Sequence, residues 1–207
     1  EDIPVLGTPV TVYEVALGLD DYVAEEGTGA NVSGTSDLAP LEEQAQMIAE
    51  LVPSAKRVGL LYCSAEPNSR FQVEEMVRSL EAMDAGYECE MYAFSDSNDL
   101  QSVVQRMASE SDVIYLPTDN TVASNTALID NVCRPLGIPV IAGEEGICEG
   151  CGIATLSISY YNLGVITAEM AAEILLQGAD VSSMPVRYDV NPVRKYNAEI
   201  CEELRIT

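Results

Sequence analysis

The sequence has no histidine and no tryptophan, and it has only two phenylalanines in 207 residues. The absence of histidine removes the commonest general base and the commonest metal ligand, although it leaves a cysteine or carboxylate enzyme open. The motifs GxSxG, GxxxxGK[ST] and a GxGxxG after a strand are missing as well. The sequence therefore predicts a protein that is not an enzyme and that holds no cofactor and no metal.

Positive charge is scarce, because 10 Lys and Arg stand against 34 Asp and Glu and give a formal charge of −24. Residues 1–55 contain no Lys or Arg at all. Binding to nucleic acid needs a basic face, so no nucleic-acid partner is expected. The acidic surface is interpreted as solubilising, and the alternative is a field that steers a cationic ligand.

Long apolar runs are also missing, since none approaches the roughly 20 residues that span a bilayer. The sequence has no basic start followed by an apolar stretch, which is the pattern of a secretion signal. We expect a soluble chain, and its first residue, Glu1, is compatible with a processed or truncated product.

What the sequence does contain is an alternation of short apolar runs with amphipathic stretches, which is typical of βα units on a parallel sheet. The expected strands are 3–7, 57–62, 88–94, 112–116, 138–142 and 186–190. The expected helices have apolar faces over 41–52, 73–80 and 100–107, two further helices cover about 122–133 and 161–176, and a short one ends at 204. Glycine and serine interrupt this pattern at 27–36 and 152–161, where we expect joints between parts of the chain.

Six cysteines are present, and Cys148 and Cys151 form a CxxC. A zinc site would need a second pair at suitable spacing, which the sequence lacks. We expect the CxxC to lie in a glycine-rich loop, as a local disulfide or as two inert thiols.

Polar residues collect in three loops that follow expected strands, and such loops share one edge of a parallel sheet. In the first loop, Asn68 or Ser69 either caps the next helix or helps to bind a ligand carboxylate. In the second, Asp119 either caps a helix or pairs with a ligand ammonium. In the third, at most one carboxylate points inward, with Glu144 as the candidate and Glu145 as part of a solvated turn.

Six segments, in this order, resemble the ABC-transporter solute-binding proteins that take up aromatic amino acids: IPVLGTPVT, NVSGTSDLAPLEEQ, AKRVGLLYCSAEPNS, SDVIYLPTDNTVAS, IPVIAGEEG and ATLSISYYNLG. The resemblance covers nearly the whole chain. It implies an α/β type I periplasmic-binding-protein fold with two Rossmann-like parallel-sheet lobes. Family members have further residues at the front, so the first lobe is expected to be incomplete.

The resemblance also implies the domain order. Residues 1–37 form part of lobe 1 and 38–153 form lobe 2, while 154–184 return to lobe 1 and 185–207 cross back to lobe 2.

By resemblance, the carboxylate of an amino acid meets Ser64, Asn68 and Ser69. Thr118, Asp119 and Asn120 take its ammonium end. Thr8 and Thr11 face them from lobe 1. The chain departs from the family at Thr11-Val12-Tyr13, where members tend to have Thr-Asp-Pro. Among the ten tyrosines, Tyr160 and Tyr161 are the candidates to stack on an aromatic ligand, and a core role is the alternative for either.

The resulting prediction is the extracytoplasmic solute-binding component of an ABC importer, which binds a small, aromatic amino acid-like ligand in an interlobe cleft. A membrane permease is the expected partner, the binding protein is expected to be a monomer, and the full-length protein is expected to be lipid-anchored. The alternative is the ligand-sensing effector domain of a regulator or signalling receptor, which would need a separate output domain.

Overall fold

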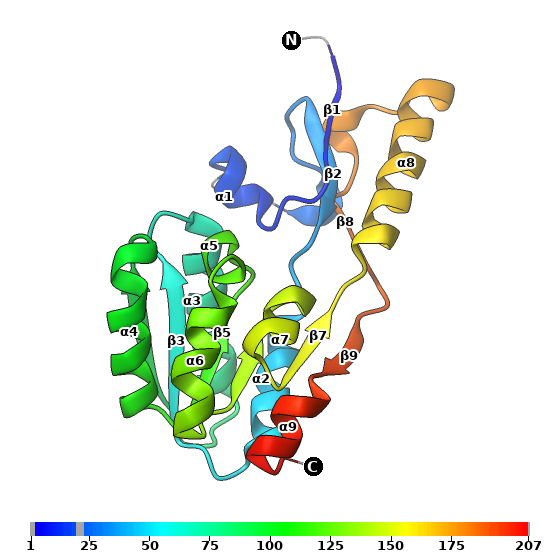
Figure 1. Ribbon diagram of the computed structural model, residues 1–207. Coiled ribbons are helices and arrows are strands. Elements are labelled where there is room, and N and C mark those ends of the chain that lie inside the picture. The colour runs from blue at the N-terminus through cyan, green and yellow to red at the C-terminus, as the bar shows by residue number, and fades with distance from the viewer. Residues whose placement is uncertain (1–2, 20–22, 207) are drawn as a thin grey trace. The chain divides into compact units, whose positions relative to one another are not determined.

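A computed structural model describes residues 3–19 and 23–206 of the chain (Figure 1). The chain folds into two compact units. Unit 1 comprises residues 1–38 and 158–192, and unit 2 comprises residues 39–157 and 193–207. The chain therefore passes between the units three times, at 38/39, 157/158 and 192/193.

Unit 2 is built on a six-stranded sheet with the order β4-β3-β5-β6-β7-β9. Neighbouring strands are parallel except for β9, which runs antiparallel to β7. The strands are β3 (Arg57–Cys63), β4 (Glu88–Phe94), β5 (Val113–Leu116), β6 (Val140–Ala142), β7 (Ala154–Ser157) and β9 (Val193–Tyr196). Because β3, β5 and β6 are parallel, the loops after them lie at one edge of the sheet.

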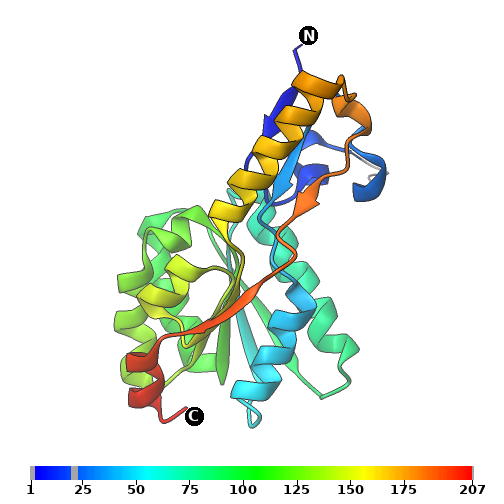
Figure 2. The same cartoon turned by 90° about the vertical axis from the view of Figure 1, so that its right-hand side faces the viewer.

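Helices cover both faces of this sheet, as Figure 2 shows with α2 and α3 on one side and the green helices on the other. The helices of unit 2 are α2 (Leu41–Leu51), α3 (Pro67–Ala82), α4 (Ser97–Glu110), α5 (Asn120–Ala123), α6 (Thr126–Leu136), α7 (Glu145–Cys151) and α9 (Ala198–Leu204). Apolar side chains of α4, α6 and α7 pack with those of β3, β5 and β6 in one continuous core. Burial of these side chains is the main favourable contribution to folding of this unit.

Unit 1 has a three-stranded parallel sheet with the order β1-β2-β8. Its elements are β1 (Val5–Gly7), α1 (Tyr13–Leu17), η1 (Ala24–Glu26), β2 (Val32–Ser36), α8 (Tyr160–Gln177), η2 (Val181–Ser183) and β8 (Arg187–Tyr188). Strand β2 lies at the centre and is the most buried strand of this unit.

The close approach of β1 and β2 depends on glycine. Gly34 has φ of 144°, and a Cβ added there would lie 2.0 Å from the carbonyl oxygen of Gly7. The space beside it is occupied by the buried Tyr13, whose hydroxyl donates to the carbonyls of Gly7 and Ser33 at 3.2 Å each. A side chain at position 34 would therefore force the two strands apart.

Within the described residues, no helix is long and apolar enough to cross a membrane. Helix α8, the longest of the described helices, ends with Leu175 and Leu176 largely exposed.

The α/β architecture with parallel sheets is confirmed, and four local expectations are corrected. The joint expected at 27–36 contains β2, and the joint expected at 152–161 contains β7, because Ser, Thr and Gly here occupy buried sheet positions. The glycine-rich loop expected around Cys148 is helix α7, in which both cysteines of the CxxC are free, buried thiols. The return to unit 1 lies at 158 rather than 154, since 154–157 pair with β6 and β9.

Candidate functional site

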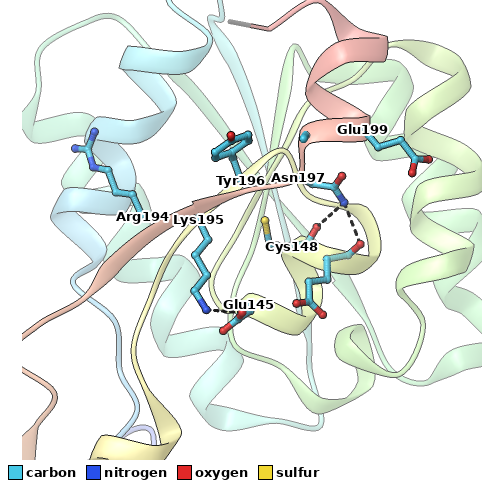
Figure 3. A pocket seen from close by; sticks show the side chains of 9 residues that line it. Glu145, Cys148, Arg194, Lys195, Tyr196, Asn197 and Glu199 are labelled. Carbon is cyan, nitrogen blue, oxygen red and sulfur yellow. Dashed lines mark hydrogen bonds and ion pairs between the residues drawn. The ribbon is translucent and has the colours of Figure 1, made fainter.

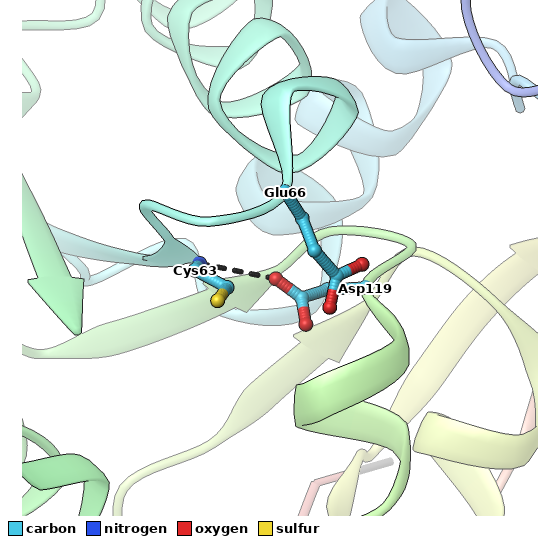
Figure 4. A group of neighbouring side chains, drawn as sticks. All are labelled: Cys63, Glu66 and Asp119. Carbon is cyan, nitrogen blue, oxygen red and sulfur yellow. Dashed lines mark hydrogen bonds between the residues drawn. The ribbon is translucent and has the colours of Figure 1, made fainter. Parts of the chain in front are cut away.

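Asp119 links two of the loops at the carboxyl edge of the unit 2 sheet (Figure 4). One carboxylate oxygen accepts from the backbone N–H of Val122 at 2.9 Å and so caps α5, and the other accepts from the N–H of Cys63 at 3.0 Å. Only 2% of the residue is exposed. The capping role considered from the sequence is present, and the oxygen that does not cap α5 holds the backbone of Cys63.

Glu66 lies beside Asp119 and performs a similar task from the opposite loop. Its Oε2 accepts from the backbone N–H and the side-chain amide of Asn120, at 3.0 and 3.1 Å. Its Oε1 accepts from the N–H and hydroxyl of Thr121, at 3.0 and 2.8 Å. The loop after β3 is thereby fastened to the first turn of α5.

The two carboxylates titrate differently because their surroundings differ. Burial raises the pKa of Asp119, the nearby charge of Glu66 raises it further, and a hydrogen bond from Ser69 opposes the shift. Burial also acts to raise the pKa of Glu66, but the bonds from Asn120 and Thr121 outweigh it and leave the pKa lowered. The pKa of Asp119 is thus raised, and that of Glu66 lowered, from the ordinary value of each group.

Cys63, Glu66 and Asp119 also form a group whose sulfur and oxygen atoms lie within 4.8 Å of one another. Every carboxylate oxygen of the group already accepts a hydrogen bond from a backbone N–H. The arrangement is suited to holding the two loops rather than to binding a cation.

The loop after β5 is held against α3 by the buried side chain of Gln72. Its amide accepts from the N–H of Thr118 and donates to the carbonyl of Thr118, both at 3.0 Å. Asn68 donates to the same carbonyl at 3.2 Å. The hydroxyl oxygen of Thr118 is buried and has no hydrogen-bond partner among the described residues.

The other predicted residues of unit 2 divide by exposure. Ser64 and Asn120 are exposed, while Ser69 is fully buried and its hydroxyl accepts from the N–H of Cys63 at 3.3 Å. Glu144 caps α7, with its carboxylate accepting from the N–H groups of Gly146 at 2.8 Å and Ile147 at 2.6 Å.

In unit 1, the predicted Thr8 and Thr11 follow β1. The hydroxyl of Thr8 accepts from that of Thr35 at 3.4 Å, and the carbonyl of Thr11 accepts from the hydroxyl of Ser36 at 2.8 Å. Both threonines thus lie at the carboxyl edge of the unit 1 sheet, beside the end of β2. Asp37 comes directly after that end and accepts from the hydroxyl of Tyr160 at 3.2 Å.

The structure thus brings the predicted residues after β3 and β5 together in one network. Sequence reasoning missed Glu66, Gln72 and Asp37. A signal existed for Asp37, because it follows a buried strand as Asp119 does, but β2 itself was interpreted as a joint. Nothing in the sequence distinguishes Gln72 from other polar helix residues.

A separate hollow of about 620 Å³ lies in unit 2 between α7, β9 and α9 (Figure 3). Four of its charged side chains already have ion-pair partners: Lys195 pairs with Glu145, Glu199 with Arg134 at 2.9 Å, and Arg194 with Glu50 at 2.6 Å. None of the residues predicted to bind ligand lines it. A charged ligand there would compete with these ion pairs.

The sequence profile of the family described as ABC transporter substrate binding protein matches residues 1–207. A tyrosine-binding protein of Clostridioides difficile (strain R20291) is 34% identical over 186 residues, which are 90% of this chain and 52% of the relative. The chain therefore spans about half the length of this curated relative.

Two solved structures resemble the whole chain. A domain from Streptococcus pneumoniae in complex with L-Trp has 32% identity and a TM-score of 0.87, and 69% of that chain is covered. A ligand-free, open substrate-binding protein with adhesive properties from Clostridium difficile has 34% identity and a TM-score of 0.77, with 68% covered. The type I periplasmic-binding fold predicted from the sequence is thereby confirmed.

Proposed function

The chain belongs to the ABC transporter substrate-binding protein family, and from this premise we propose that it is the extracytoplasmic solute-binding component of an ABC importer for an aromatic amino acid. The observation that carries the proposal is the likeness, over the whole chain, to a domain solved with L-Trp. The tyrosine-binding relative supports the same ligand class.

The proposal includes a mode of action. The protein binds its ligand in a cleft between two lobes and releases it, chemically unchanged, to a membrane permease, as a monomer whose full-length form carries a lipid anchor. The homologues are substrate-binding proteins, which supports a role in binding rather than in catalysis.

Within unit 2, we assign the ligand contacts to the outer residues of the loop network. Ser64, Asn68 and Asn120 are exposed or half-buried. The amides of Asn68 and Asn120 each donate one hydrogen bond within the protein and keep a second N–H for a carboxylate, whereas the hydroxyl of Ser64 would have to leave the carbonyl of Phe94. The unpartnered hydroxyl of Thr118 is the further polar group available to a ligand.

The buried members of the predicted set have a supporting role in this proposal. Ser69 and Asp119 hold the backbone of Cys63, and Glu144 orders the first turn of α7. Thr8 and Thr11 supply contacts from unit 1. Tyr160 and Tyr161 are 46% and 81% exposed, which leaves their rings available to stack on an aromatic ligand.

A thermal-shift series on the full-length protein tests the function. We expect L-Tyr, L-Phe or L-Trp, at a hundred times Kd, to stabilise the protein by about 2.7 kcal/mol, a rise in Tm of roughly 5 to 10 °C. L-Ala, L-Glu and myo-inositol serve as controls. A shift with inositol instead of the aromatic amino acids would contradict the ligand class, and no shift with any small molecule would favour a sensing role.

A further inference from the structure

Asp37 is a buried carboxylate that is only half satisfied. It follows β2 at the carboxyl edge of the unit 1 sheet, and 7% of the residue is exposed. Its Oδ2 accepts from the hydroxyl of Tyr160 at 3.2 Å. Its Oδ1 is buried and has no hydrogen-bond partner in the part of the chain that the structure describes. A buried carboxylate oxygen without a donor costs free energy, so a donor supplied from outside the described residues would stabilise it.

Asp189 provides a comparison within the same unit. It follows β8, the strand next to β2, and is also 7% exposed. Both of its oxygens are occupied, because Oδ2 accepts from the N–H of Ser159 at 2.7 Å and Oδ1 accepts from the N–H of Asn191 at 3.2 Å. Position at the sheet edge and burial are therefore not sufficient to leave an oxygen without a donor.

No cationic side chain of unit 1 is available to Asp37. The sequence ranges of this unit, 1–38 and 158–192, contain one Lys or Arg, namely Arg187. Arg187 is bound to Glu173, with both carboxylate oxygens within 3.0 Å of its guanidinium. Residues 1–38 contain eight Asp and Glu, and residues 158–192 contain four, so the local field attracts a positive group.

We propose that Asp37 is the residue that receives the ammonium group of the ligand, through Oδ1. This inference rests on the proposed function, since it names the partner of one end of an amino-acid ligand. The hydroxyl of Tyr160 fixes the other oxygen and so sets the orientation of the carboxylate. A charge-assisted hydrogen bond formed away from water is among the strongest that a protein can offer an ammonium.

The geometry of unit 2 supports this assignment over the one made from the resemblance. Asp119, to which the ammonium was assigned from the sequence, already has a backbone N–H donor on each oxygen and is only 2% exposed. Asp37 would lose no hydrogen bond of its own when Oδ1 accepts from a ligand. Of the two aspartates, Asp37 is therefore the one with a carboxylate oxygen that still lacks a donor.

Calorimetry with two ligands tests the assignment in the full-length protein. L-Tyr carries the ammonium, and 3-(4-hydroxyphenyl)propionate is the same molecule without it. For Asp37→Asn we expect the affinity for L-Tyr to fall about 10- to 100-fold while the affinity for the analogue is unchanged. The matched control Asp189→Asn should keep the wild-type ratio of the two affinities.

Three results would overturn the assignment. In Asp37→Asn, they are an unchanged ratio of the affinity for L-Tyr to the affinity for the analogue, or an equal loss of affinity for both ligands. The third is a fall of this ratio in Asp119→Asn instead. Failure of the wild-type protein to bind any aromatic amino acid would be seen before any variant is made, and it would remove the proposed function together with this inference. If Asp37→Asn does not fold, Tyr160→Phe frees Oδ2 but keeps the charge. In that variant the affinity for L-Tyr should fall several-fold and the affinity for the analogue should be unchanged. Equal losses of affinity for both ligands would again refute the role of Asp37.

Discussion

Units 1 and 2 each place a nearly buried aspartate beyond the end of a parallel strand, and they treat it in opposite ways. In unit 2, Asp119 receives two N–H groups and is tied through Glu66 into a network that holds two loops. In unit 1, Asp37 receives one hydroxyl and keeps an unpartnered oxygen. The first arrangement stabilises the fold, and the second leaves free energy to be gained from a ligand.

The distribution of positive charge follows the same division. Nine of the ten Lys and Arg lie in the ranges of unit 2, where many form ion pairs such as Arg57 with Asp112 at 2.6 Å. Unit 1 has one, and it is paired. A unit that contains few cations of its own is suited to receive one from outside.

The largest effect should come from breaking the strand packing of unit 1. Gly34→Ala places a Cβ against the carbonyl of Gly7 at a positive φ, so we expect the free energy of unfolding to fall by about 3 kcal/mol or more. Urea denaturation measures the change. The control Gly164→Ala lies in α8 with open space around it and should be neutral or stabilising by up to about 1 kcal/mol. Similar results for the two variants would refute the close packing described here.

The next largest effect is expected at Asp119, the aspartate whose two carboxylate oxygens both have backbone donors. Asp119→Ala removes a helix cap and the acceptor of the Cys63 N–H, and we expect a loss of about 2 to 3 kcal/mol in stability. Asp96→Ala, which removes the exposed cap of α4, should cost only about 1 kcal/mol. Chemical denaturation of both variants gives the comparison. A loss for Asp119→Ala no larger than that for Asp96→Ala would mean that the carboxylate is not structural.

A smaller effect is expected at the unpartnered hydroxyl of unit 2. Thr118→Val removes no hydrogen bond of the free protein, so its stability should be unchanged or slightly raised. Ligand affinity should fall about 5-fold, as for one neutral hydrogen bond of ~1 kcal/mol. Thr155→Val removes another unpartnered hydroxyl, buried within β7, and should leave affinity unchanged. Equal affinities for all three proteins would exclude Thr118 from the site.

The smallest effect is a dependence on pH. Hydrogen bonds from the side chain and backbone of Arg57 lower the pKa of Asp112 from 3.8 to about 2. The ionised form is thus favoured by folding, and its contribution is present above pH 4 and is lost as the pH falls toward 2. The Tm of wild type should exceed that of Asp112→Asn at pH 5, and most of the difference should be lost by pH 2. A difference at pH 2 as large as that at pH 5 would show that the contribution is not ionic.

Much of this architecture could be predicted from the sequence. The strands β3, β4 and β5 and the helices α2, α3 and α4 were predicted because their apolar residues recur at the periods of buried strands and amphipathic helices. Strand β2 was missed because its buried positions are Ser33, Gly34, Thr35 and Ser36, whose burial depends on partners such as Tyr13 and Thr167 rather than on hydrophobicity.

The candidate site was less predictable than the fold. The rule that ligands bind beyond the carboxyl ends of strands identified the correct loops, but it could not say which side chains are used up within the protein. Gln72 and Glu66 decide this, since they bond the backbone of Thr118 and Asn120 across some fifty residues of sequence. Such pairings follow from tertiary packing, and no local pattern reports them.

The chemistry of the native cysteines has a practical consequence. All six are free, and each is buried or half-buried. Burial raises the pKa of Cys133 and Cys148 to about 12 and that of Cys89 to about 11, so at neutral pH these thiols are almost entirely protonated and slow to alkylate. A cysteine introduced at an exposed position such as Leu176 would react with a maleimide dye far faster than these native thiols. The protein can thus be labelled with a dye at a chosen exposed position without first removing its own cysteines.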